Sequence, residues 1–454
     1  MRFLPHTADD VRAMLAAVGA ADVGALFADI PAALRASATL NLAPGLPEVE
    51  VRGRLQALAV QNTAAQQPCF IGAGAYPHFV PAVVDQIIQR AEFYSAYTPY
   101  QPEVSQGTLQ AIFEFQSMVA LLLGMEVANA SMYDGASATA EAVLMALRMH
   151  PKRRRIILSR ALHPQYREVV RTYIAGASLP GGGAGASPIE LIEAPFTAAG
   201  GTDPVWVAQA IDDQTAAVVI GYPNFFGVIE DLKGFAALAH AAGAALISVT
   251  TEALALGLLK SPGTHGADIA VAEGQSLGIP MSYGGPGVGL FATRNESVRT
   301  MPGRLVGEAV DGAGRRGYVL TLATREQHIR REKATSNICT NHGLMALAFT
   351  VHVATLGKAG IRKLAIANTA AAHRVAARLT RAGWRVQFTA PFFNEFVATR
   401  QGAAAAWENA RVAGVLAGVP LGRWYPELAE SLLLCVTEMH DDASVERLMG
   451  SLGE

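Results

Sequence analysis

The sequence predicts an α/β protein with a mainly parallel sheet in a large domain, followed by a smaller α/β domain. Two observations support this prediction. Strand-like and helix-like segments alternate between residues 153 and 251, and the pattern changes near residue 355. Such alternation implies parallel strands joined by right-handed crossovers. With 454 residues, 51% of them hydrophobic, the chain is long enough for more than one domain.

Three domains are expected. Residues 1–66 should form a helical arm, because Leu, Val and Ala recur at helical spacing around breaks at Pro31 and at residues 43–47. Residues 67–354 should form the large domain, and residues 355–454 the small one. The large domain begins with a loop-rich stretch whose prolines and aromatic residues make it too rigid for an ordinary linker. We therefore expect this stretch to be ordered and functional.

The remaining elements follow in order. One helix should end at Gly124, and the next should begin near Asp134 or Ser137. Alternating strands and helices are then predicted at 153–160 (strand), 164–173 (helix), 215–222 (strand), 231–243 (helix) and 244–251 (strand). The small domain should contain a helix through His373 and Arg381, a strand at 396–399, a helix, a strand at 432–437 and a final helix after Asp441.

Composition excludes several function classes. A net charge of −2 provides no field that would hold nucleic acid or an anionic membrane. Cys69, Cys339 and Cys435 are widely spaced and form no CxxC pair, so neither a disulfide framework nor a metal site is expected. The first residues lack the apolar segment of a secretion signal, and the most apolar stretch, 235–249, is shorter than a bilayer span. A soluble cytoplasmic protein without a membrane partner is the expectation.

Seven segments together carry a family resemblance. They are FIGAGAYPHFVP (70–81), FYSAYTPYQPEVSQGTLQAIFEFQ (93–116), ANASMYDGAS (128–137), PNFFGVIED (223–231), YGGPGVG (283–289), MPGRLVG (301–307) and TREQHIRREKATSNICTN (324–341). They resemble the N-terminal half of glycine dehydrogenase (decarboxylating), the P-protein family of the glycine cleavage system. Their spacing is similar to that of the family's separate first subunit, over the whole chain.

The resemblance implies a large domain of the pyridoxal phosphate (PLP) transferase type, fold type I, similar to aspartate aminotransferase. It also implies an α2β2 heterotetramer in which the partner, subunit 2, carries PLP. That complex would decarboxylate glycine and pass the aminomethyl group to the lipoyl group of H-protein. This chain alone would be inactive.

PLP chemistry requires a lysine that forms a Schiff base and a carboxylate against the pyridine nitrogen. In enzymes of this type the aspartate lies on the strand before the lysine. The matching strand here reads ALISVTT and has no carboxylate, and Glu252 follows too late. The lysine position falls near Gln275 and Ser276, and no lysine lies between Lys260 and Lys333. We therefore expect no PLP bound by this chain and no catalytic residue in the chain alone. We interpret Asp134–Ser137 as an ordinary helix cap rather than a phosphate site.

Two segments are candidates for completing the partner's active site. The first is a rigid loop with hydroxyl, amide and carboxylate groups suited to positioning substrate: Tyr97, Thr98, Tyr100, Gln101 and Glu103. A buried packing loop is the equally weighted alternative. The second is the stretch 294–333, with nine basic and five acidic residues. Its candidates for an anion or carrier-protein patch are Arg304, Arg325, His328, Arg330 and Arg331. A helix with ion pairs such as Glu326 to Arg330 would give the same pattern.

Two rival functions remain open at this level. One is a self-sufficient PLP enzyme such as a transaminase or desulfurase, which the missing lysine argues against. The other is a scaffold that regulates the partner without lining its active site. Single changes of Tyr97, Tyr100 and Glu103 would separate a scaffold from an active-site component.

Overall fold

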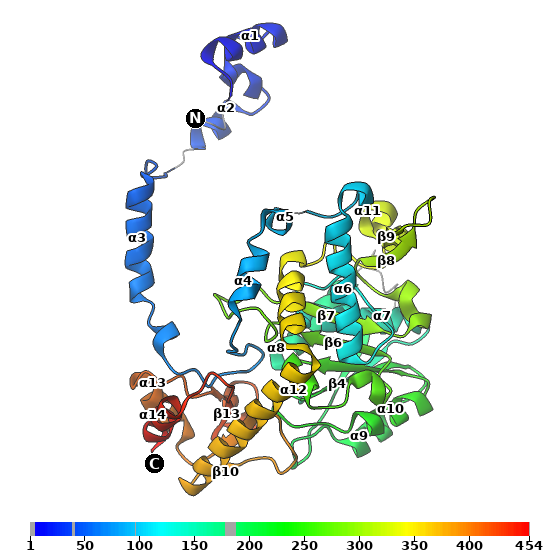
Figure 1. The fold of residues 1–454 in the computed structure, drawn as a ribbon, viewed down its shortest axis with the longest axis vertical. Helices are drawn as coiled ribbons and strands as arrows, with labels where there is room; N and C mark the ends of the chain where they lie inside the picture. The colour runs from blue at the N-terminus through cyan, green and yellow to red at the C-terminus, as the bar shows by residue number, and fades with distance from the viewer. Residues whose placement is uncertain (1–4, 39–40, 96, 178–187, 454) are drawn as a thin grey trace. The chain divides into compact units, whose positions relative to one another are not determined.

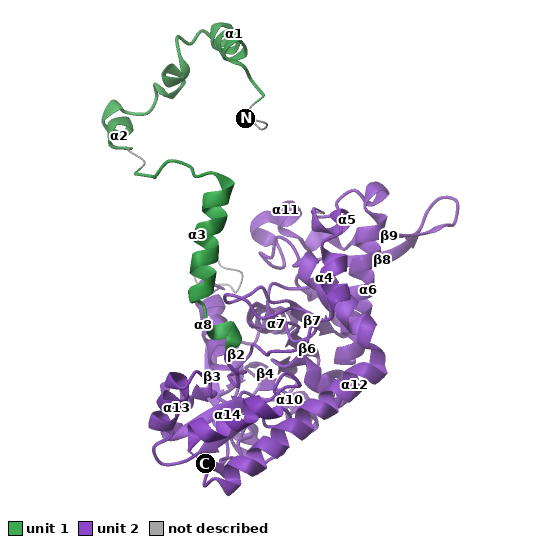
Figure 2. Ribbon diagram, turned by 60° about the vertical axis from the view of Figure 1, so that its left-hand side comes forward, with its two compact units in different colours: residues 1–66 green, residues 67–454 purple. Residues whose placement is uncertain are grey.

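The computed structural model describes residues 5–38, 41–95, 97–177 and 188–453 (Figure 1). These residues divide into two compact units, Met1–Gln66 and Gln67–Glu454 (Figure 2). The first unit contains the helices α1 (Ala8–Val18), α2 (Ala32–Ser37) and α3 (Glu48–Gln61). A capping box starts α1, in which the Thr7 hydroxyl accepts the backbone N–H of Asp10. None of the described residues of the first unit is buried.

A seven-stranded sheet forms the centre of the second unit, in the order β1-β7-β6-β5-β4-β2-β3. Strands β6, β5, β4, β2 and β3 are parallel, and β7 and β1 complete the sheet through antiparallel pairs. The bounds are β1 Val127–Ala128, β2 Arg155–Ser159, β3 Glu190–Ala194, β4 Thr215–Gly221, β5 Ala245–Thr250, β6 Ile269–Glu273 and β7 Gly289–Thr293. The predicted α/β class with a mainly parallel sheet is confirmed.

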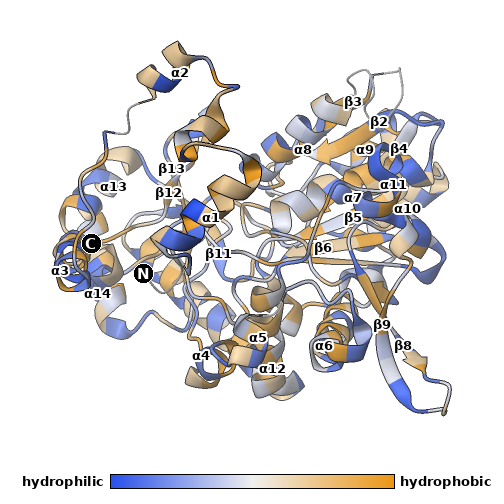
Figure 3. Ribbon diagram, turned by 90° about the horizontal axis from the view of Figure 1, so that it is seen from above, coloured by the Kyte–Doolittle hydropathy of each residue, from blue (hydrophilic) through white to orange (hydrophobic). Residues whose placement is uncertain are grey.

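Helices cover both faces of this sheet, and the strands are therefore hydrophobic on both faces (Figure 3). In β4, Val218 and Ile220 belong to the cluster that contains α6 (Gln106–Leu123), α10 (Leu232–Ala241) and α12 (Gly343–Arg381). The alternate residues Ala217 and Val219 face the other cluster. That cluster contains α7 (Gly135–Met149) and α8 (Pro164–Ala177).

A smaller antiparallel sheet lies in the C-terminal part of the same unit, in the order β10-β11-β13-β12. Its strands are β10 Arg385–Val386, β11 Glu395–Thr399, β12 Val419–Pro420 and β13 Ser431–Cys435, and its helices are α13 Ala403–Val412 and α14 Asp442–Leu452. Buried side chains of α13, α14 and the end of α12 pack on this sheet. The boundary predicted at residues 354 and 355 falls inside α12, next to Gly357, whose backbone is not helical.

Length and composition alone would allow α12 to span a bilayer. The helix is interrupted at Gly357, and its buried residues, among them Phe349 and Leu379, pack in the hydrophobic clusters of both sheets. We therefore assign α12 to the core of the second unit.

The remaining elements frame the candidate site. Short helices precede α6, namely α4 (Ala82–Ile88), α5 (Ala91–Tyr94) and η3 (Pro102–Val104). A hairpin of β8 (Leu305–Val310) and β9 (Arg316–Thr321) follows the large sheet. The chain continues through the short helical turns η7 (Ala323–Arg325), α11 (Gln327–Arg330) and η8 (Arg331–Lys333) before it enters α12.

Candidate functional site

The carboxyl ends of the parallel strands meet the start of α7, the edge at which α/β sheets commonly bind ligands. Asp134 caps this helix, because its Oδ1 accepts the backbone N–H of Ser137 at 2.7 Å. The Ser137 hydroxyl in turn accepts the backbone N–H of Asp134 at 3.3 Å. The predicted cap is confirmed, and it satisfies one of the helix's free N–H groups internally.

Glu273, the last residue of β6, supplies a second internal acceptor at the same helix end. Its Oε2 accepts the N–H of Gly135 at 2.8 Å, and its Oε1 accepts the N–H groups of Gln275 and Val288, both at 2.9 Å. Burial raises the pKa of this carboxyl to about 7, although the three backbone hydrogen bonds oppose the shift. A carboxyl group of the protein therefore occupies the first N–H of α7.

Gln275 and Ser276 lie just beyond β6, at the position where the resemblance places the lysine. Both are buried. The Gln275 amide accepts the N–H of Tyr76 at 2.9 Å and donates to the carbonyl of Ile279 at 2.6 Å. Gln275 thus ties the loop 70–79 to the edge of the sheet. Ser276 Oγ is buried without a hydrogen-bond partner among the described residues.

The neighbouring strand β5 ends at another buried cluster. Ser248 is fully buried on β5, and Glu252 follows this strand. Oε2 of Glu252 lies 3.0 Å from His78 Nε2, and His78 Nδ1 lies 2.8 Å from Glu438 Oε2. Glu252 is therefore committed to His78 instead of facing a ligand. Sequence reasoning missed this His78 cluster, because its members are far apart along the chain.

Four of the five active-site-completing candidates lie in the loop between α5 and η3, and the fifth, Glu103, lies in η3 itself. Tyr97 is 81% exposed, and Gln101 and Glu103 are also exposed. Thr98 and Tyr100, in contrast, have their hydroxyl groups fixed by the same buried side chain, Arg304. The loop is thus anchored at two hydroxyls, while its other polar groups point to solvent.

Arg304 precedes β8 and is 4% exposed. It donates to Thr98 Oγ1 at 3.1 Å, Tyr100 OH at 2.8 Å, Thr340 Oγ1 at 2.8 Å, Cys339 O at 2.5 Å and Glu326 Oε2 at 3.3 Å. A guanidinium has five N–H donors, and these five hydrogen bonds use them all. Arg304 therefore joins the candidate loop to the segment 326–340.

The structure corrects the expectation that Arg304 and Arg325 form part of a surface patch. Arg325 is 9% exposed and donates to the carbonyls of Leu322, Met301 and Gly303. Its burial lowers the pKa of the guanidinium. Both arginines use their donors inside the fold. The segment between β9 and α12 contacts Arg304 through Cys339 and Thr340, whereas Arg325, which belongs to that segment, binds backbone carbonyls that include those of Met301 and Gly303. His328, Arg330 and Arg331 are the three candidates that remain exposed.

The alternative explanation, an ion pair of Glu326 with Arg330 along a helix, is not seen among the described residues, since Glu326 pairs with Arg304 and α11 is only four residues long. Glu326 is 8% exposed. Its Oε2 lies 3.6 Å from His328 Nδ1, and the His328 ring lies edge-on to Tyr100 with centroids 5.5 Å apart.

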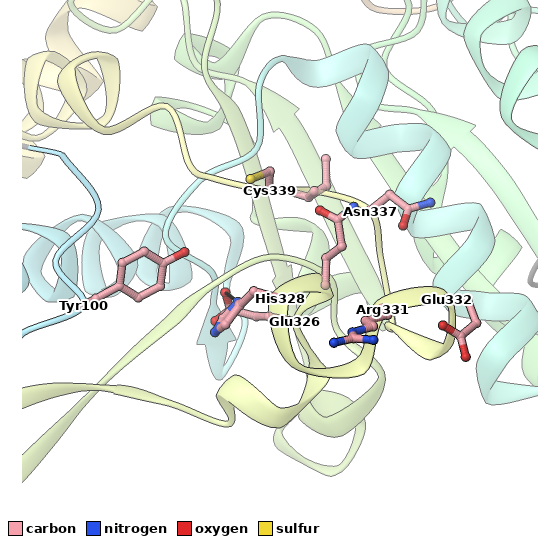
Figure 4. Close-up of a pocket in the computed structure, with 9 residues that line it drawn as sticks. Tyr100, Glu326, His328, Arg331, Glu332, Asn337 and Cys339 are labelled. Atoms are coloured by element: carbon pink, nitrogen blue, oxygen red, sulfur yellow. Dashed lines mark ion pairs between the residues drawn. The ribbon is translucent and has the colours of Figure 1, made fainter. Parts of the chain in front are cut away.

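A cavity of about 550 Å³ opens beside this group of residues (Figure 4). Tyr100 faces the side chains of Glu326 and His328 in this view, and Arg331 and Glu332 lie farther along the same segment. The lining is Tyr100, Glu326, Gln327, His328, Arg331, Glu332, Asn337, Ile338 and Cys339. The cavity thus combines members of both segments that the sequence singled out.

The sheet order and the helix at its carboxyl edge define the class: this is the fold of the PLP-dependent enzymes of fold type I. The structure matches a sphingosine-1-phosphate lyase of Burkholderia pseudomallei with a TM-score of 0.66 and 17% identity, covering 93% of this chain and 94% of that one. It also matches a cysteine desulfurase of Escherichia coli with a TM-score of 0.62 and 16% identity, covering 87% and 97%. At these identities the likeness concerns the fold alone.

The chain belongs to the glycine cleavage system P-protein family, whose model matches residues 1–452. It is 52% identical over 455 residues to a probable glycine dehydrogenase (decarboxylating) subunit 1 of Anaeromyxobacter dehalogenans, covering 100% of both chains. A protein of the same name from Phenylobacterium zucineum is 54% identical over 456 residues, again covering 100% of both. A solved structure of glycine decarboxylase (P-protein) in inhibitor-bound form matches with a TM-score of 0.89 and 43% identity, covering 100% of this chain and 99% of that one.

The residues of this chain do not fit PLP. The cofactor would need an amine near Gln275, a carboxylate on β5 and free N–H groups at the start of α7. At the position of the amine, the Gln275 side chain accepts a hydrogen bond from Tyr76 N–H. β5 has Ser248 and no carboxylate, and Glu273 already accepts the first N–H of α7. We therefore assign no step of PLP chemistry to this chain.

Proposed function

We propose that this chain is the PLP-free subunit of a heteromeric glycine decarboxylase, and that it acts only together with a partner subunit of the same fold. The family membership and the relatives named subunit 1 support a divided enzyme. The observation that carries the proposal is the edge of the large sheet, where Gln275 stands at the lysine position and Glu273 occupies the helix terminus. The cofactor site then belongs to the partner.

In this proposal the complex decarboxylates glycine and transfers the aminomethyl group to the lipoyl group of H-protein. The assembly is an α2β2 heterotetramer in the cytoplasm. All three cysteines are free, which fits a reducing compartment. Nucleic acid and membrane have no part in the proposal, and no group of three or more His, Cys, Asp or Glu in the described ranges could hold a metal ion.

The chain's own contribution is the anchored loop 97–103. Arg304 fixes Thr98 and Tyr100 and thereby sets the direction in which Tyr97, Gln101 and Glu103 project. A loop fixed before assembly places polar groups beside the partner's site at a smaller entropic cost than a mobile loop would. The exposed His328, Arg330 and Arg331 are the candidates for meeting an acidic carrier protein.

Co-expression with the lysine-bearing subunit tests the proposal. We expect a complex whose native mass corresponds to two copies of each chain, and glycine decarboxylation that neither chain performs alone. Borohydride reduction in the presence of equimolar PLP should attach a phosphopyridoxyl group to the partner and leave this chain unmodified. A stoichiometric label on a lysine of this chain would contradict the proposal.

Tyr97→Phe distinguishes an active-site component from a scaffold. Because Tyr97 is 81% exposed, loss of its hydroxyl should not change the folding of this chain. We expect the decarboxylation rate of the complex to fall at least about tenfold, as when one positioned hydrogen-bonding group is removed from an active site. Tyr94→Phe, which removes the hydroxyl of a tyrosine that is 69% exposed, is the matched control. Unchanged rates for Tyr97→Phe, Tyr100→Phe and Glu103→Gln, with intact assembly, would favour the scaffold.

A further inference from the structure

Glu326 lines the cavity beside Tyr100, and one of its carboxylate oxygens has no hydrogen-bond partner among the described residues. Glu326 is 8% exposed, and its Oε2 faces Arg304 and His328. Its Oε1 is buried, and none of the described residues donates a hydrogen bond to it. A buried carboxylate oxygen without a donor costs free energy, so such an atom beside a cavity marks a position for a ligand's donor.

The other lining groups narrow the ligand's chemistry. A carboxylate oxygen only accepts hydrogen bonds, so its partner must donate, and a protonated amine does so most strongly. The Tyr100 ring and Ile338 offer apolar contact to a narrow chain behind that amine. The cavity, at about 550 Å³, is large enough for such an arm. Its rim carries both charges, Arg331 and Glu332, and therefore does not by itself select an ion of either sign.

We propose that this cavity binds a protonated primary amine at the end of a slender, partly apolar arm, with the ammonium donating to Glu326 Oε1. The identity of this amine rests on the proposed function. In the aminomethyl transfer proposed above, the group that carries such an amine is the aminomethyl group on the lipoyl arm of the carrier protein. Arg304 positions Glu326 through Oε2 and leaves Oε1 for the ligand.

Cys339 provides a built-in reporter, because its exposed thiol lines the same cavity. Its thiolate displaces methanesulfinate from a methanethiosulfonate and forms a mixed disulfide with the rest of the reagent. On the full-length chain, the rate of this labelling is measured by peptide mass spectrometry with 2-aminoethyl methanethiosulfonate, which carries an ammonium, and with neutral methyl methanethiosulfonate. Both rates are normalised to those of a free thiol, and Cys69, outside the cavity, is the internal control.

We expect the cationic reagent to label Cys339 about tenfold faster than the neutral one, as a charge-assisted hydrogen bond would cause. Glu326→Gln should reduce this ratio to about one- to twofold, since it removes the charge. Glu332→Gln, a change of the exposed carboxylate on the same lining, should leave most of the preference in place. Equal labelling rates in the natural chain, or equal losses in the two variants, would overturn the proposal.

A measurement without substitutions covers the case in which Glu326→Gln fails to fold. Butylammonium chloride should slow the labelling of Cys339 by the neutral reagent, whereas butanol at the same concentration should not. Equal effects of the two compounds would argue against an amine site. None of these measurements needs a partner or glycine turnover. A chain that shows the amine preference but forms no active complex would therefore refute the proposed function and leave the amine site in place.

Discussion

Arg304→Ala is expected to abolish glycine decarboxylation by the assembled complex, with a loss of at least about a hundredfold, because positioning groups contribute on this scale. The substitution removes five hydrogen bonds that join the loop 97–100 to the segment 326–340. It also leaves the carboxylate of Glu326 buried without its cation, which typically costs about 3–5 kcal/mol. We expect the loop to lose its fixed direction even where the chain still folds.

The measurement is a decarboxylation assay on co-expressed complexes, together with limited proteolysis of the loop. Arg304→Lys should be intermediate, because an ammonium has three donors and cannot replace the planar five-donor group. Arg316→Ala is the matched control, since Arg316 is 60% exposed and pairs with Glu308 at the surface. A complex with Arg304→Ala that retained full activity would show that the loop's direction does not matter for the reaction.

His78→Ala is expected to destabilise the second unit by about 3–5 kcal/mol, the usual cost of removing one partner from a buried ion pair. The His78 side chain is 2% exposed and lies between Glu252 and Glu438. Its removal leaves the buried carboxylate of Glu252 and the partly buried carboxylate of Glu438 without a cation between them. His240→Ala is the control, because His240 is 47% exposed and its pair with Asp268 should contribute no more than about 1 kcal/mol.

The same cluster predicts how stability depends on pH. Burial alone would lower the pKa of His78, but Glu252 and Glu438 outweigh it and raise the pKa to about 10. Burial alone would raise the pKa of Glu438, but His78 lowers it to about 2. The His78 contribution is therefore complete below its ordinary pKa of about 6.5 and is lost as the pH rises through 10. The Glu438 contribution is complete above the ordinary carboxyl pKa and is lost as the pH falls through 2.

Urea unfolding at pH 6, 8 and 9.5 checks this dependence. The free energy of unfolding should fall steadily across that range in the natural chain and fall less in His78→Ala. Two other groups face the cluster. Asn368, 2.9 Å from Glu438, does not ionise. Burial lowers the pKa of His352 to about 4, so the effect of His352 is a rise in stability as the pH approaches its ordinary pKa of about 6.5, which is opposite to the expected fall. Parallel curves for the two chains would show that His78 is not the titrating group.

The sequence was informative where local patterns determine structure. Strands β2, β4 and β5 and the cap at Asp134 follow from short-range alternation and capping residues. Strands β6 and β7 were not predicted, because they are short and apolar and are separated by a glycine-rich turn without a helix. The small sheet is antiparallel, which its alternating segments did not reveal.

The candidate site could be predicted only in part. Rigidity and polar groups selected the loop 97–103, and the excess of basic residues selected the stretch 294–333, but this charge count treated Arg304 and Arg325 as part of a surface patch. A charge count takes no account of backbone carbonyls and hydroxyls. These groups accept hydrogen bonds from the two arginines and so allow both guanidinium groups to be buried. The cluster of His78, Glu252 and Glu438 depends on contacts across 174 and 360 positions of the chain, which no local pattern encodes.

The carboxyl group of Glu273 at the start of α7 has a thermodynamic consequence. A ligand that binds a helix terminus in the native state adds its own binding free energy to folding, so the amount of folded protein then follows the ligand's concentration. This chain carries its own acceptor at that terminus. Its folding is therefore insulated from the supply of any phosphate-bearing metabolite that would bind there, whereas the stability of a cofactor-binding partner rises and falls with that supply.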